Sequence, residues 1–294
     1  MRMKIVFTIL LLGLQQIDSS TDTFCYQNPE CGPESWDHTY PTCNGTMQSP
    51  IDIKTNTTWR MDQLGAFSFQ GYNESNRLLN ITHTKKTIRV TLAPGMKVTG
   101  GGLPWTYLPV QFHLHWGGSV ASGGSEHRLD GQQYGMELHI VHRREGINLT
   151  EAFSGPQGLA VMGFFIKIES NIQENPSWKN LTRLVKNLTE DGDELTINAP
   201  LSLMDLIGSV NLTKYFRYNG SLTTPECDEV VLWTIFQEPI RLNASLVETF
   251  FTDIFVNSTQ GSLLLNTFRP TQQNVNAVWM SRDASSSPPA PPLP

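Results

Sequence analysis

QFHLHWGG, residues 111–118, places two histidines two positions apart in an otherwise apolar run. Successive side chains of a β-strand point to opposite faces of the sheet. We therefore predict that His113 and His115 share one face, while Phe112 and Leu114 share the other and face a core. Two imidazoles side by side in a cavity are costly unless something binds them. The stretch alone is consistent with a divalent-metal site and with a pair of hydrogen-bonded core histidines.

Strand-like segments surround this stretch. Runs rich in β-forming residues and bounded by Gly, Pro and Asn occupy 81–92 and 136–142, and 158–168 and 229–240 are also typical of strands. Apolar residues recur with helical spacing at 176–188 and 243–255. With no internal repeat and no long linker before about residue 282, the chain is predicted to be one domain of sheet with peripheral helices.

Composition narrows the function classes. The chain has 294 residues, of which 16% are charged, and its net charge is -6. It has no run of Lys or Arg, because the short pair Arg143–Arg144 is followed by Glu145. The sequence therefore does not indicate a nucleic-acid partner.

Both ends of the chain differ from the middle. The N-terminus combines MRMK, a ten-residue apolar run and a polar stretch, which predicts a secretory signal peptide at 1–20. No stretch is long and apolar enough to predict a membrane span. The domain is expected at 21–281, and the Ser/Pro-rich residues 282–294 are expected to be a disordered tail.

Secretion is also favoured by sequons and cysteines. Four cysteines in an oxidising compartment predict two disulfides, with three connectivities open. The density of sequons likewise indicates a secreted glycoprotein. N-x-S/T begins at Asn44, Asn56, Asn73, Asn80, Asn148, Asn180, Asn187, Asn211, Asn219, Asn243 and Asn257.

A third histidine favours the metal reading. Glu137 and His139 share a strand face in YGMELHIVH, so His139 can join His113 and His115 if the two strands pair. Three neutral nitrogen ligands leave a fourth tetrahedral position open, which is typical of catalytic Zn²⁺ sites. Gln111 and Glu137 each lie two residues before a ligand, on the same strand face. They either accept hydrogen bonds from the outer N–H groups of these imidazoles or are ordinary exposed polar residues.

At this point the sequence resembles the α-class carbonic anhydrases. The resemblance rests on QFHLHWGG, GSEH at 124–127, ELHIVH at 137–142 and SLTTP at 221–225, with QSPIDI at 48–53 and VLWTIFQEPI at 231–240 in the same order. It extends from about residue 24 to 270. It implies the fold class α+β, a single domain built on a large, mainly antiparallel twisted sheet of about ten strands with short peripheral helices.

The resemblance also implies an activity, the zinc-dependent reversible hydration of CO₂ to bicarbonate and a proton. His113, His115 and His139 would hold Zn²⁺, and zinc-bound hydroxide would attack CO₂. Thr223 would accept a hydrogen bond from this hydroxide and donate to Glu126, although T-T-P is also an ordinary turn sequence. Thr224 would help to hold bicarbonate. The apolar wall for CO₂ would consist of Val141, Val161, Leu222 and Trp233.

Proton transfer to solvent is the remaining step. It requires a partly exposed group with a pKa near the working pH, a few water molecules from the metal. By the resemblance His83 is this shuttle, and Tyr26 helps to order the water chain. The neighbouring Lys85 and Lys86 would lower the pKa of His83 if they lie close to it.

The cysteines match an extracellular subgroup of this family. The resemblance implies the bridges Cys43–Cys227 and Cys25–Cys31, the second of which is typical of glycolipid-anchored members. Because the chain ends in PPAPPLP and not in a hydrophobic anchor signal, we expect a secreted protein, or an anchored one if the C-terminus is incomplete. We further expect a monomer inhibited by sulfonamides. An inert binding module and a zinc esterase are the alternatives.

Overall fold

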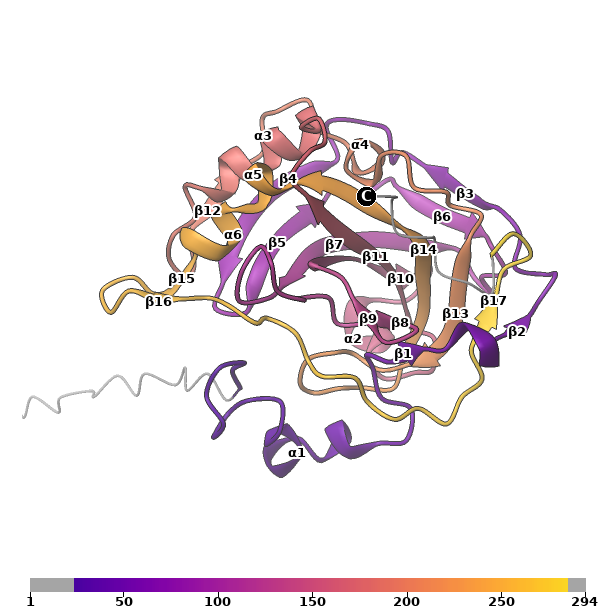
Figure 1. Ribbon diagram of the computed structural model, residues 1–294. Helices are drawn as coiled ribbons and strands as arrows, with labels where there is room; N and C mark the ends of the chain where they lie inside the picture. The colour runs from indigo at the N-terminus through magenta and orange to yellow at the C-terminus, as the bar shows by residue number, and fades with distance from the viewer. Residues whose placement is uncertain (1–23, 285–294) are drawn as a thin grey trace, which may run out of the picture.

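A twelve-stranded sheet runs through the molecule (Figure 1). The computed structural model describes residues 24–284, so the expected signal peptide at 1–20 and residues 285–294 of the expected tail lie outside it. The strand order is β12-β4-β5-β7-β10-β11-β14-β13-β17-β2, and β3 and β6 join the sheet beside β7. Most neighbouring strands are antiparallel, with parallel pairs at β11–β14 and β17–β2. The predicted α+β architecture is confirmed.

The strands vary widely in length. The bounds are β1 Asp52–Ile53, β2 Trp59–Arg60, β3 Phe67–Gln70, β4 Leu78–Thr84, β5 Thr87–Leu92, β6 Lys97–Gly100, β7 Tyr107–Trp116, β8 Arg128–Leu129, β9 Gln132–Gln133, β10 Met136–Arg144, β11 Leu159–Glu169, β12 Glu194–Thr196, β13 Tyr215–Gly220, β14 Val231–Asn243, β15 Phe255–Asn257, β16 Ser262–Leu263 and β17 Trp279–Met280. The strands β17 and β2, at one end of the sheet, have two residues each, which is too short for a periodic pattern and explains why the sequence predicts about ten strands.

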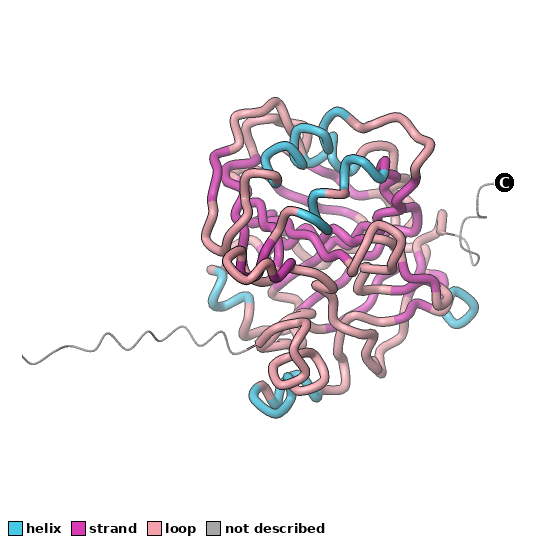
Figure 2. The backbone as a smooth tube through the Cα atoms, turned by 60° about the vertical axis from the view of Figure 1, so that its left-hand side comes forward, coloured by secondary structure: helices cyan, strands magenta, loops and turns pink. Residues whose placement is uncertain are grey.

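The helices are short and peripheral (Figure 2). They are α1 Trp36–Thr39, α2 Leu149–Ala152, α3 Pro176–Val185, α4 Leu203–Ile207, α5 Ala244–Val247 and α6 Thr249–Thr252, with 3₁₀ turns at Pro41–Asn44 and Thr55–Thr57. The helix predicted at 176–188 is α3, which the Asn175 side chain caps at its N-terminus. The segment 243–255 contains two helices, α5 and α6, where the sequence predicts one. No helix within residues 24–284 has the length and apolarity needed to cross a bilayer.

The two faces of the central strands bury different residues. Phe112 and Leu114 of β7 belong to the larger core, which also contains Trp178 and Leu181 of α3. On the opposite face a smaller core includes Val161 of β11. The alternation predicted for QFHLHW is therefore observed, and the histidines of β7 lie on the face away from α3.

Two disulfides fasten the N-terminal segment. Cys25 is bonded to Cys31, and Cys43 is bonded to Cys227 across a sequence separation of 184 residues. The backbone N–H of Cys227 donates to the carbonyl of Thr224. The long-range bridge therefore holds the N-terminal segment against the loop that contains Thr223 and Thr224.

Candidate metal centre

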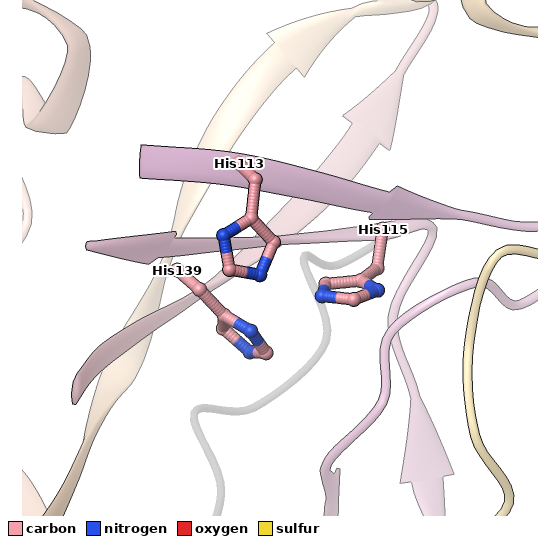
Figure 3. Close-up of side chains that lie close together, drawn as sticks. All are labelled: His113, His115 and His139. Atoms are coloured by element: carbon pink, nitrogen blue, oxygen red, sulfur yellow. The ribbon is translucent and has the colours of Figure 1, made fainter. Parts of the chain in front are cut away.

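Strands β7 and β10 bring three histidines together. The antiparallel register places His139 directly opposite His113, and Glu137 directly opposite His115. Directly paired residues point to the same face. The imidazole of His139 consequently lies 4.6 Å from that of His115 and 5.2 Å from that of His113, measured between ring centroids. Figure 3 shows the three rings converging from the two strands.

Each imidazole is held by one ring nitrogen. His113 Nδ1 donates to Gln111 Oε1 at 3.0 Å, and His115 Nδ1 donates to the carbonyl oxygen of Thr267 at 2.6 Å. His139 Nε2 donates to Glu137 Oε1 at 2.7 Å. These contacts fix the tautomers and leave the lone pairs on His113 Nε2, His115 Nε2 and His139 Nδ1.

Burial keeps these rings neutral. It lowers the pKa of His113 well below its usual range, with a further lowering by the positive charges of the neighbouring imidazoles and of Arg89. Burial likewise lowers the pKa of His115 to about 3 and, against the pull of Glu137, that of His139. Neutral imidazoles are the form that binds a metal ion.

The donor set fits Zn²⁺. One ring nitrogen from each of the three histidines lies within 4.8 Å of the others, and His115 Nε2 is buried without a hydrogen-bond partner among residues 24–284. A buried nitrogen lone pair is costly when nothing binds it. Three imidazoles without a thiolate, and with room for a fourth ligand, are the coordination sphere of a catalytic zinc site.

Glu137 links the histidine cluster to the smaller core. Its Oε1 also accepts from His127 Nδ1 at 2.7 Å, and His127 Nε2 lies 2.6 Å from the Tyr218 hydroxyl. Burial by itself raises the pKa of Glu137, but the imidazoles of His127 and His139 outweigh it and hold that pKa well below the usual range. An ionised carboxylate at this position fixes the orientation of the His139 ring.

Glu126 and Thr223 lie beside the same cluster. Glu126 Oε2 is 3.3 Å from His115 Nε2, and its Oε1 accepts the backbone N–H of Arg269 at 2.9 Å. Burial raises the pKa of Glu126, while the Thr223 side chain and the Arg269 backbone oppose this shift. The structure thus places Thr223 and Glu126 near one another beside the histidines, and the donation from Thr223 to Glu126 stays a prediction.

A pocket of about 190 Å³ opens at the histidines. Its walls combine polar and apolar side chains, and the Trp233 ring packs against His139 with 4.9 Å between the ring centroids. They are formed by Gln111, His113, His139, Val141, Phe153, Leu159, Val161, Leu222, Thr223, Thr224 and Trp233. All the substrate-binding residues suggested by the resemblance therefore lie around one cavity.

Four site residues were missed by the sequence analysis. Phe153 and Leu159 line the pocket, and Thr267 orients His115 through its carbonyl oxygen. Gly163 lies opposite His139 on β11, where a Cβ atom would come within 3.0 Å of Glu137 Oε1 and 2.7 Å of the Ile235 side chain. A glycine inside a strand signals such a close approach, and this signal was available in GLAVMGFF.

Tyr26 lies next to the site but lines another cavity. That cavity, of about 490 Å³, is also lined by Phe24, Lys85 and Lys86. The Nζ of Lys86 donates to the carbonyl oxygen of Phe24. Burial and the nearby Glu126 raise the pKa of Tyr26. Its effect on water order in the metal pocket stays a prediction.

The expected position of His83 is wrong. Its side chain is fully buried in β4, and both ring nitrogens lack a hydrogen-bond partner among the described residues. His83 lies opposite Ile88, and Ile88 belongs to the core face of β5 together with Val90. Because His113 lies on the other face, His83 is neither exposed nor on the side of the sheet that a proton shuttle requires.

This burial predicts a pH-dependent loss of stability. Burial lowers the pKa of His83, although the nearby backbone of Glu190 and the carboxylates of Asp191 and Asp193 oppose the shift. The unfolded chain therefore binds a proton more readily, so the stability of the neutral, folded form is present above about pH 6.5 and declines as the pH falls below it. We expect His83→Leu to flatten the loss of unfolding free energy between about pH 7 and pH 5.

Denaturant titrations of the wild type and His83→Leu at each pH measure this effect. The other histidines contribute equally to both proteins and cancel in the difference. His38→Leu is the matched control, because His38 is exposed. Parallel stability curves for the wild type and His83→Leu would show that His83 does not contribute.

Comparison with known proteins shows the family of this chain. The family model of eukaryotic-type carbonic anhydrases matches residues 31–281. Carbonic anhydrase 4 of Oryctolagus cuniculus is 34% identical over 298 residues, which cover 98% of this chain and 94% of that protein. Carbonic anhydrase 15 of Mus musculus is 35% identical over 257 residues, covering 83% and 78%. Carbonic anhydrase 12 of Homo sapiens is 32% identical over 276 residues, covering 90% and 76%.

The twisted sheet with a three-histidine pocket defines an enzyme of the carbonic anhydrase type. The chain belongs to the eukaryotic-type carbonic anhydrase family. The hydration of CO₂ is the reaction of that family.

Proposed function

We propose that this protein catalyses the zinc-dependent, reversible hydration of CO₂ to bicarbonate and a proton, with Zn²⁺ held by His113, His115 and His139. One observation carries the proposal. Each imidazole is anchored through one nitrogen, and the remaining nitrogens converge, including the buried and unpartnered Nε2 of His115.

The metal and the residues around it have separate tasks. Bound Zn²⁺ supplies a nucleophile near neutral pH by lowering the pKa of a water molecule, which is the established role of zinc in carbonic anhydrases. A cation held by the three histidines would favour the ionised form of Glu126 against the effect of burial. Ionised Glu126 only accepts hydrogen bonds, so the Thr223 hydroxyl donates to it and keeps its lone pairs for the reacting water.

The apolar residues of the pocket receive CO₂. Val141, Val161, Leu222 and Trp233 are among the residues that line it. An apolar wall binds an apolar substrate and holds no water molecule tightly in its place. Thr224 lies at the same cavity and provides a hydroxyl for the bicarbonate product.

The proposal contains no His83 step. Among the residues that line the pocket, the only histidines are the ligands His113 and His139, and burial lowers the pKa of both. The proton passes from the pocket to solvent, and His83 lies on the far side of the sheet from that route.

We also propose that the protein is secreted and monomeric. Its two disulfides suit an oxidising compartment. The sequon asparagines Asn44, Asn56 and Asn73 are exposed, so the fold has room for glycans there.

Stopped-flow CO₂ hydration on the purified protein, with zinc assayed on the same sample, tests the function. We expect about one zinc per chain and rapid hydration that a sulfonamide inhibits. Folded protein without zinc would overturn the ligand assignment. Zinc-loaded protein without turnover would overturn the proposed activity and leave a metal-binding role.

A further inference from the structure

A row of polar side chains continues the metal face of the sheet beyond β7. The register of β5 with β7 places Arg89 opposite His113 and Thr91 opposite Gln111. Cross-strand partners of this kind point to the same face with their Cβ atoms about 5 Å apart. Arg89 and Thr91 are exposed, whereas the alternating residues Ile88 and Val90 are buried. Arg89 therefore lies beside the metal centre, on its solvent side.

Two hydrogen-bond donors of this row, the Arg89 guanidinium and the Gln111 amide nitrogen, have no acceptor among the residues that the structure describes. Among residues 24–284, the Arg89 guanidinium has no hydrogen bond or ion pair. Gln111 Oε1 accepts from His113, and within the same residues the amide nitrogen of Gln111 has no acceptor. A cation and an amide N–H group thus face solvent next to the pocket.

The carboxylate on this row is engaged elsewhere. Glu194 of β12 lies opposite Thr82, and Thr82 lies opposite Arg89. Glu194 Oε1 accepts a hydrogen bond from the Asn80 side-chain amide at 3.0 Å, and Glu194 Oε2 accepts one from the Thr82 hydroxyl at 2.9 Å. The positive charge of Arg89 is therefore left for a ligand.

We propose that Arg89, together with the Gln111 amide, forms a subsite for a carboxylate on ligands whose other end occupies the three-histidine centre. This subsite rests on the proposed zinc function. The guanidinium is planar and binds a carboxylate through two parallel N–H groups, which Gln111 supplements from the neighbouring strand. The pocket thereby selects ligands with an anionic group on the β5 side over neutral ligands of the same shape.

Two sulfonamides of nearly equal shape test the subsite. 4-Sulfamoylbenzoate carries a carboxylate, and 4-sulfamoylbenzamide carries a neutral amide at the same position. Calorimetric titration of the zinc-loaded protein gives both affinities for the wild type, R89Q and R183Q. We expect R89Q to weaken benzoate binding about three- to fivefold, as for an exposed ion pair, with no change for the benzamide.

R183Q is the matched control. Arg183 is exposed on α3, which packs on the opposite face of the sheet. R183Q therefore changes the net charge by the same amount as R89Q, but at a position far from the pocket. We expect R183Q to bind both compounds as the wild type does. R89K keeps the charge without the planar fork and should retain part of the preference.

The possible results separate the two proposals. Tight benzamide binding with the same benzoate-to-benzamide ratio in R89Q and the wild type overturns the subsite alone. An equal loss of benzoate affinity in R89Q and R183Q assigns the effect to net charge and also overturns it. If neither compound binds the wild type, the zinc function fails and the subsite fails with it.

Discussion

His115→Ala is expected to remove both the zinc and the CO₂ hydration activity. The substitution deletes one of three ligands, and the ligand it deletes has its free nitrogen fully buried. Loss of an outer-shell partner of a metal ligand typically costs 10–100-fold in metal affinity or activity. Loss of the ligand itself should therefore lower activity by more than about a hundredfold.

Zinc content and stopped-flow hydration measure this result on one sample. His38→Ala is the control, because its imidazole is exposed and should leave both quantities unchanged. Circular dichroism shows whether each variant is folded. A folded His115→Ala protein that retains one zinc per chain, or the hydration rate of the wild type, would contradict the proposed centre.

Removing the Cys43–Cys227 bridge should have the largest effect on stability. The double variant C43S/C227S opens a loop of 184 residues, for which the chain-entropy account gives about 5 kcal/mol of unfolding free energy. The chain also offers a matched control. C25S/C31S opens a loop with a separation of only 6 residues, and the same account gives about 2 kcal/mol.

Guanidinium titration of the wild type and both double variants measures the difference. We expect C43S/C227S to be less stable than C25S/C31S by about 2–3 kcal/mol. Equal losses in the two variants would show that loop length does not determine the stabilisation. Because Cys227 contacts Thr224, C43S/C227S should also lower the hydration activity under conditions in which it remains folded.

Local patterns in the sequence predicted much of the fold and of the centre. The period of two along β7 fixes which side His113 and His115 share, and the same period on β10 aligns Glu137 with His139. These inferences need only neighbouring residues and one strand pairing. The order of the twelve strands could be expected only from the resemblance, because no local pattern states which strands become neighbours.

The wrong position of His83 and the missed partner of His115 both have causes that lie in tertiary structure and not in the local sequence. A two-residue turn at Lys85–Lys86 sets the β4–β5 register, and this register places His83 opposite Ile88 on the core face. The sequence NITHTKK contains no sign of which face that would be. The partner of His115 was missed because a backbone carbonyl at Thr267 has no sequence signature.

The contacts that complete the centre have a consequence for the order of events during protein synthesis. All three imidazoles have been synthesised once residue 139 is added, yet the carbonyl that orients His115 comes 152 residues after it. The backbone N–H that binds Glu126 belongs to Arg269, 143 residues further along the chain. A ribosome adding about 5–20 residues per second therefore delivers the histidines several seconds before the groups that position them. The three-histidine centre consequently matures late, once the segment that contains Thr267 and Arg269 has been synthesised and has packed against the site.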